Sequence, residues 1–116
     1  MLFRSRTTTI ISFSNDPDAK NEFGPYTPGF ISIPYNDLDA LEETLKDSNI
    51  AGFMLEPIQG EAGVFVPDDG YLKGAKELCQ QSGVLFIADE VQSGIARTGK
   101  LLAVDHEDVE IGRAHV

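Results

Sequence analysis

The clearest pattern in the chain is a set of leucines at helical spacing. Leu38, Leu41 and Leu45 recur three or four residues apart, and acidic residues occupy many of the positions between them. Residues at this spacing lie on one face of a helix. Asn36 or Asp37 can cap its amino end, because either side chain can accept hydrogen bonds from the first turn. The sequence therefore predicts an amphipathic helix of about three turns.

Two continuous apolar runs and a second helical pattern follow. The runs 51–55 and 84–88 predict buried strands, and residues 71–82 between them predict a helix that Gly83 ends. The apolar face of this helix comprises Leu72, Ala75, Leu78 and Cys79. Helices that alternate with uniformly apolar strands predict an α/β fold, with a mostly parallel sheet covered by helices on both faces.

The first third of the chain has a different character. Residues 6–36 are rich in turn formers, including Asn15-Asp16-Pro17, Gly24-Pro25 and Pro28-Gly29. Long regular elements are not expected there, and only residues 30–33 resemble a short strand.

Composition and charge narrow the classes of function. The chain has 116 residues, of which 41% are hydrophobic, and its net charge is −10. A strongly acidic chain without a basic patch is a poor partner for nucleic acid or an anionic membrane surface. No apolar run approaches the roughly 20 residues that span a bilayer. Cys79 is the only cysteine and is expected to be a buried small apolar residue, and His106 alone does not predict a metal site.

Carboxylates follow both predicted strands. Glu56 and Glu61 come after the first strand, and Asp89 and Glu90 come directly after the second. In parallel α/β sheets, ligands bind outside the carboxyl ends of the strands. The four acids are therefore expected to converge on one edge of the sheet.

Three interpretations of the pair Asp89-Glu90 remain open at this point. The acids can simply solvate a strand end, or they can hold magnesium in a nucleotide hydrolase. Residues 94–100 match the opening of a phosphate-binding loop, but Leu101 lacks the hydroxyl that this loop needs next. In the third interpretation, Asp89 holds the protonated ring nitrogen of a pyridoxal cofactor, and Gln92 donates to the neighbouring phenolate oxygen.

Two long motifs favour the third interpretation. Residues 56–63 read EPIQGEAG, and residues 85–94 read LFIADEVQSG, followed by RTGK at 97–100. Together they resemble the core of the class III, fold-type I aminotransferases. The resemblance implies that residues 6–109 form part of a large, cofactor-binding domain that binds pyridoxal 5'-phosphate. The segment 23–37 is similar to the branch of the family that uses ornithine.

The resemblance also implies roles for individual residues. Asp89 matches the partner of the pyridinium nitrogen, and Gln92 matches the residue that contacts the phenolate oxygen. Glu61 matches a glutamate that pairs with an active-site arginine while the amino donor is bound. Arg6 matches the arginine that holds the α-carboxylate of ornithine.

Three further residues, Glu56, Glu90 and Arg97, are expected to support the site. Arg97 either braces its loop through an ion pair or contacts a ligand. The Schiff-base lysine of the family is expected beyond Val109, so that this chain alone would be inactive. The lysines that do not match its motif are Lys20, Lys46, Lys73, Lys76 and Lys100.

The implied activity is transfer of the δ-amino group of L-ornithine to 2-oxoglutarate, giving glutamate-5-semialdehyde and glutamate. The alternatives are another ω-aminotransferase, acting on acetylornithine or 4-aminobutyrate, or an inactive fragment that at most contacts other proteins. The resemblance implies a homodimer or higher homo-oligomer in the mitochondrial matrix or cytoplasm. Residues 1–5 and 110–116 depart from the family and resemble translated adapter DNA, so we expect these ends to be non-native.

Overall fold

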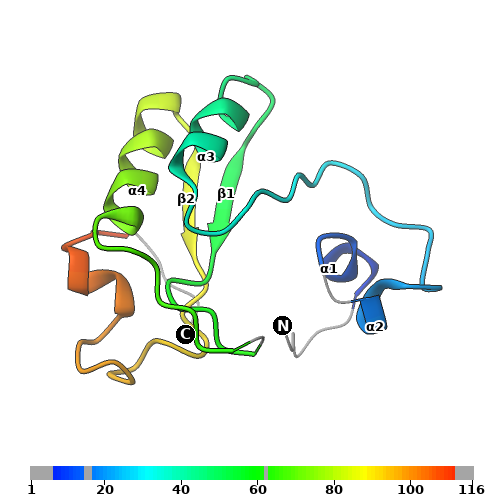
Figure 1. Ribbon diagram of the computed structural model, residues 1–116. Helices are drawn as coiled ribbons and strands as arrows, with labels where there is room; N and C mark the ends of the chain where they lie inside the picture. Colours follow the sequence, from blue (N-terminus) through cyan, green and yellow to red (C-terminus); the bar gives the residue numbers. More distant parts are fainter. Residues whose placement is uncertain (1–6, 15–16, 62, 112–116) are drawn as a thin grey trace. The chain divides into compact units, whose positions relative to one another are not determined.

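The computed structural model describes residues 7–14, 17–61 and 63–111, in two compact units. The first unit, Met1–Ile33, contains two short helices, α1 (Thr8–Ser12) and α2 (Pro17–Lys20) (Figure 1). The second unit, Pro34–Val116, contains all the strands of the described residues. No helix in the described ranges is both long and apolar enough to cross a membrane.

The first unit is held by contacts between its helices and its loops. The Thr7 side chain caps α1 by accepting a hydrogen bond from the Ile10 N–H. The Thr27 N–H donates to Ser12 Oγ over 2.7 Å, and the rings of Phe13 and Phe30 lie 5.0 Å apart. As predicted, the described part of this region contains no long element.

The predicted strand at residues 30–33 is wrong. These residues form no ladder with any described strand, and Ile31 is 62% exposed. A short apolar sequence becomes a strand only where a neighbouring strand pairs with its backbone. No such neighbour pairs with these residues in the described part of the chain.

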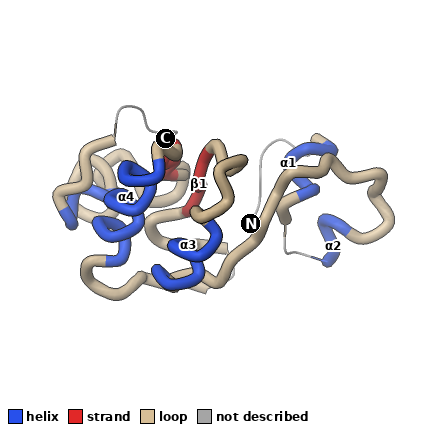
Figure 2. Tube along the Cα trace, turned by 90° about the horizontal axis from the view of Figure 1, so that it is seen from above, coloured by secondary structure: helices blue, strands red, loops and turns tan. Residues whose placement is uncertain are grey.

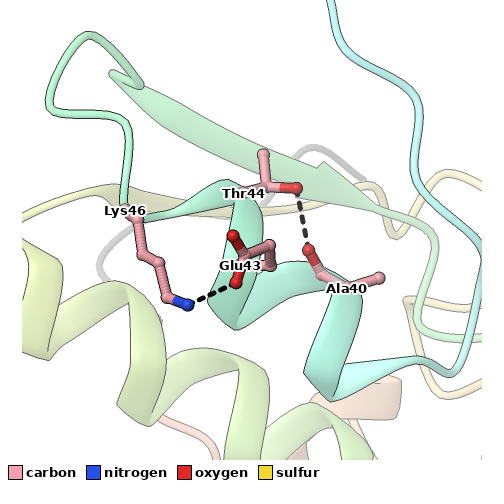
Figure 3. Close-up of polar contacts among 4 residues, drawn as sticks. All are labelled: Ala40, Glu43, Thr44 and Lys46. Carbon is pink, nitrogen blue, oxygen red and sulfur yellow. Dashed lines mark hydrogen bonds and ion pairs between the residues drawn. The ribbon is translucent and has the colours of Figure 1, made fainter.

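The first helix of the second unit is α3 (Leu38–Thr44), and Asp37 caps it by accepting from the Ala40 N–H over 2.8 Å. It has about two turns instead of the three predicted. Thr44 Oγ1 donates back to the Ala40 carbonyl over 2.8 Å, and Lys46 pairs with Glu43 (Figure 3). Beyond them the chain turns, because Asp47 accepts hydrogen bonds from Asn49 that compete with a helix.

The longer helix, α4 (Tyr71–Ser82), has the predicted bounds. Gly83 ends it in the left-handed conformation, with φ 67°. Its buried residues are Tyr71, Leu72, Ala75 and Cys79. Helices α3 and α4 lie side by side (Figures 1 and 2), and Gly74 permits this approach because a Cβ there would lie 2.7 Å from Leu38 Cδ1.

Strands β1 (Gly52–Leu55) and β2 (Leu85–Ala88) form the predicted parallel pair. Their register runs from Gly52 opposite Leu85 to Leu55 opposite Ala88. The core beside them is formed by Leu55, Tyr71, Leu72, Ala88, Val104 and Val109. Two of these residues belong to or follow the 3₁₀-helix η1 (Ala103–Glu107).

The expectation that helices cover both sheet faces is wrong for the described residues. Phe53 and Phe86 pack against the core, as the alternation of strand side chains requires. On the opposite face Met54, Leu85 and Ile87 are 45%, 68% and 40% exposed. Among the described residues, the two helices α3 and α4 therefore cover only one face of the two-stranded sheet.

Candidate functional site

The carboxyl ends of the two strands bring two carboxylates together. The Asp89 N–H donates to the Leu55 carbonyl over 2.8 Å, so Asp89 continues the parallel ladder beside Glu56. Burial raises the pKa of the half-buried Glu56 carboxyl, and the charges of Asp89 and Glu61 raise it further. A hydrogen bond from the Gly60 backbone opposes this shift. Three of the four predicted acids therefore share one electrostatic neighbourhood.

A short loop carries Glu61 to the second strand end. Gln59 and Phe65 exchange two backbone hydrogen bonds of 3.0 Å, which close the loop, and Gly63 has φ 113°. A positive φ of this size favours glycine. Within reach of the closed loop, Gln92 Nε2 donates to Glu61 Oε1 over 3.3 Å. Glu61, in the loop after β1, and Gln92, in the turn after β2, thus lie together.

Asp89 itself is held by its own turn. Its Oδ1 accepts from the Val91 N–H over 3.1 Å, and the side chain is half-buried. Among the described residues, no hydrogen bond reaches its second oxygen, Oδ2. One oxygen is therefore fixed by the backbone, while the other can accept a hydrogen bond from a ligand.

Tyr35 anchors this edge of the sheet, although no sequence motif marks it as a site residue. Its hydroxyl donates to the carbonyls of Glu56 and Pro57 over 3.1 and 3.0 Å. Its ring packs edge-on against Tyr71 with centroids 5.5 Å apart. Burial, followed by the neighbouring Tyr71 and Glu56, raises the pKa of the Tyr35 hydroxyl. Only its aromatic type and its place before α3 hint at this role in the sequence.

Glu90 does not join the other three acids. It is fully buried and accepts hydrogen bonds from the backbone N–H groups of Ala103 and Val104 over 3.1 and 3.0 Å. The Ser93 hydroxyl also donates to it. Glu90 therefore fixes the start of η1, and the expected convergence of four acids is wrong for this residue.

No described contact brings the predicted residue Arg97 to the strand ends. Arg97 is exposed and forms no ion pair with any described residue. It follows Ile95 and Ala96, which both have positive φ, so its loop is conformationally constrained. Arg6 lies outside the described residues.

The nucleotide-hydrolase interpretation does not fit the fold. Residues 94–100 lie in consecutive turns that follow Asp89-Glu90, and η1 after them is a short 3₁₀-helix. A phosphate-binding loop instead connects a strand directly to an α-helix. In the described ranges, no three His, Cys, Asp or Glu side chains gather closely enough to hold a metal ion.

Comparison with known proteins shows the family of this chain. The family described as aminotransferase class-III matches residues 2–111. The chain belongs to the class III aminotransferases. This match agrees with the parallel pair of strands and the helices beside it, which form part of a fold-type I large domain. The domain boundaries at residues 6 and 109 stay a prediction.

Individual class III aminotransferases are similar over most of this chain. The mitochondrial ornithine aminotransferase of Rattus norvegicus is 63% identical over 107 residues, which are 92% of this chain and 24% of that protein. A structure of ornithine aminotransferase from Toxoplasma gondii, described with partial occupancy of PLP at its active site, has a TM-score of 0.89. It is 57% identical and covers 92% of this chain and 25% of that one.

A structure of acetylornithine aminotransferase from Elizabethkingia anophelis is also similar. Its TM-score is 0.70, and it is 69% identical over 72% of this chain and 22% of that one. The chain spans about a quarter of the length of the relatives that it matches.

Proposed function

We propose that this chain is a segment of a pyridoxal-phosphate-dependent ornithine aminotransferase. The complete enzyme would transfer the δ-amino group of L-ornithine to 2-oxoglutarate and release glutamate-5-semialdehyde and glutamate. The observation that carries the proposal is the group Asp89, Glu56 and Glu61 at the carboxyl end of a parallel pair, in a chain 63% identical to a named ornithine aminotransferase.

The chemistry of this group fits the ring of pyridoxal phosphate. The bound cofactor supplies an electron sink, which works best while its ring nitrogen stays protonated. Asp89 has one oxygen fixed by the Val91 N–H, and its second oxygen can accept a hydrogen bond from the protonated ring nitrogen. The neighbouring charges of Glu56 and Glu61 favour a cation at the same place. These residues support Asp89 as the group that keeps the ring nitrogen protonated.

Gln92 is proposed to act on the same ring from the phenolate side. Its Nε2 carries two hydrogens, of which one is donated to Glu61. The second remains for the phenolate oxygen, where a donor stabilises negative charge. Gln92 would therefore adjust the electron demand of the ring without transferring a proton.

Substrate binding is proposed for two residues. Arg6 would hold the α-carboxylate of ornithine by charge-assisted hydrogen bonds, so that the δ-amino group reaches the cofactor. Glu61 would pair with an active-site arginine while the donor is bound and release it for 2-oxoglutarate. We further propose a homodimer or higher homo-oligomer that works in the mitochondrial matrix or the cytoplasm.

The test uses the complete protein that carries this segment. Purified enzyme is given L-ornithine and 2-oxoglutarate, and glutamate-5-semialdehyde is measured. Asp89→Asn is expected to lower kcat about 100-fold, because it removes a charge that stabilises the reacting state. It should also change the cofactor absorption spectrum. Asp69→Asn is the matched control, because Asp69 is exposed in a loop. Normal turnover and an unchanged spectrum in Asp89→Asn would exclude the assigned role.

A second candidate substrate is N-acetylornithine. It has less support than ornithine, because the 69% identity to the acetylornithine aminotransferase of Elizabethkingia anophelis extends over 72% of this chain, whereas the ornithine aminotransferase of Rattus norvegicus matches 92% of it. Comparing kcat/KM for L-ornithine, N-acetylornithine and 4-aminobutyrate separates the candidates. A preference for either of the last two would replace ornithine as the substrate and leave the cofactor roles intact.

A further inference from the structure

Gly60 lies directly against the side-chain amide of Gln92. A Cβ placed on Gly60 would lie 2.0 Å from Gln92 Oε1 and 2.8 Å from Gln92 Cδ. Neither distance can exist between real atoms that are not bonded, so any other residue at 60 must displace the amide. The φ of Gly60 lies outside the left-handed region. A side chain at this position would therefore act by moving the exposed Gln92 amide and not by straining the backbone.

A second contact fixes which way the amide faces. Gln92 Nε2 donates to Glu61 Oε1 over 3.3 Å, while its Oε1 lies over Gly60. Gln92 is exposed and follows the end of β2, so its own turn leaves the side chain free to change rotamer. The loop after β1 thus restricts a side chain that belongs to the loop after β2.

We propose that Gly60 is a positioning residue, which together with Glu61 seats the Gln92 amide with Nε2 in a defined direction. The inference rests on the proposed function, in which Gln92 donates to the phenolate oxygen of the cofactor. The backbone of Gly60 leaves room for the Gln92 amide, and Glu61 accepts the hydrogen bond from its Nε2. We call this pair of contacts the seat of the amide. Gly60 acts through Gln92 and does not itself touch substrate.

A double-mutant cycle in the complete holoenzyme tests this seat. The variants are Gly60→Ala, Gln92→Ala and the double variant, and the measurements are kcat/KM, the cofactor dissociation constant and the pH titration of cofactor absorbance. Gly60→Ala is expected to lower kcat/KM by about 10-fold to 100-fold, because a displacement of about 1 Å has this effect. Its absorbance titration should move toward that of Gln92→Ala.

The decisive measurement is kcat/KM of the double variant. If Gly60 acts through Gln92, adding Gly60→Ala to Gln92→Ala changes kcat/KM by less than about twofold, whereas independent effects would multiply. Multiplied effects, or a Gly60→Ala variant with unchanged kinetics and absorbance, would overturn the proposal. Gly52→Ala is the matched control, since its new methyl would meet nothing closer than Ile87 Cδ1 at 3.4 Å.

A further measurement keeps the inference separate from the proposed function. The side-chain amide resonance of Gln92, observed by NMR in cofactor-free protein, should shift in both Gly60→Ala and Glu61→Ala. An unchanged resonance would refute the seat, whatever reaction the enzyme catalyses. If Gly60→Ala does not fold, the Gln92 amide resonance in Glu61→Ala still tests the contact, because Glu61 accepts the hydrogen bond from Gln92 Nε2.

Discussion

Glu56 is a carboxylate kept in unfavourable surroundings. Burial and the nearby charges of Asp89 and Glu61 raise its pKa above the ordinary 4.5. A protein that held these acids only for stability would gain by spreading them over its surface. A carboxylate with a raised pKa beside other carboxylates is instead typical of a site that binds a cation or handles a proton.

Replacing Glu56 by glutamine should therefore stabilise the protein at neutral pH. The folded-state pKa is raised, so the protonated carboxyl favours folding below pH 4.5, and this advantage is lost as the pH rises through the folded-state pKa. Glu56→Gln should raise the free energy of unfolding by up to about 1 kcal/mol at pH 7.5, discounted because the group is only half-buried. At pH 4 it should give almost no gain.

The measurement is thermal unfolding of the cofactor-free complete protein at both pH values. Glu77→Gln is the control, because Glu77 is exposed on α4 and its substitution removes the same charge. A stability gain equal at the two pH values would contradict the electrostatic explanation.

The strand-end acids also show how far the sequence predicts the candidate site. Apolar runs that end in carboxylates were sufficient to bring Asp89, Glu56 and Glu61 to one edge. Glu90 was misplaced because adjacent residues of an extended chain point to opposite sides, so that Asp89 and Glu90 could not both face a ligand. The contacts of Tyr35 and Gly60 depend on residues more than 20 positions away, and no local pattern encodes them.

Helix α4 shows how far the sequence predicts a single element. The spacing of its apolar residues and the position of Gly83 predict its bounds, and the structure confirms them. The group that caps its amino end is not evident from the sequence, because Gly70 offers no side chain to cap it. The acceptor comes instead from Glu107 in η1, whose Oε2 accepts from the Lys73 N–H over 2.9 Å. One carboxylate both completes the first turn of α4 and ties η1 to it.

Glu107→Ala should therefore loosen the start of α4. The loss of a capping acceptor costs about 1 kcal/mol. Amide hydrogen exchange at residues 71–74 of the complete protein should become roughly fivefold faster, since about 1 kcal/mol corresponds to that ratio. Exchange near Gly83 should stay as it was. Glu77→Ala is the control, as an exposed glutamate of α4 without a described capping contact. Equal effects of the two substitutions would show that Glu107 is not the cap.

At the scale of the whole molecule, the sheet has one covered face and one open face. The apolar runs predict strands buried on both sides, because Met54, Leu85 and Ile87 are apolar. The prediction that both faces are covered fails for the described residues of the second unit, because α3 and α4 lie on the same side of the strands (Figure 2). Apolar side chains on an open face expose surface that proteins usually bury.

The open face leads to opposite expectations for this segment alone and for the complete protein. The relatives are about four times longer, and a complete enzyme of the proposed function would have further chain to cover Met54, Leu85 and Ile87. In the isolated segment, Ile87→Lys should reduce self-association, which sedimentation velocity measures, because a charge on an apolar strand opposes association. In the complete protein it should lower the free energy of unfolding by more than about 2 kcal/mol, because it would bury an unpaired charge.

Ser82→Lys adds the same charge at an exposed position of α4 and should do neither. If the complete protein tolerated Ile87→Lys as well as Ser82→Lys, the face would be open in the native enzyme too. The strands would then owe their apolar sequence to something other than burial. If only the complete protein is destabilised, the apolar residues of β1 and β2 are explained by a layer that lies outside these 116 residues.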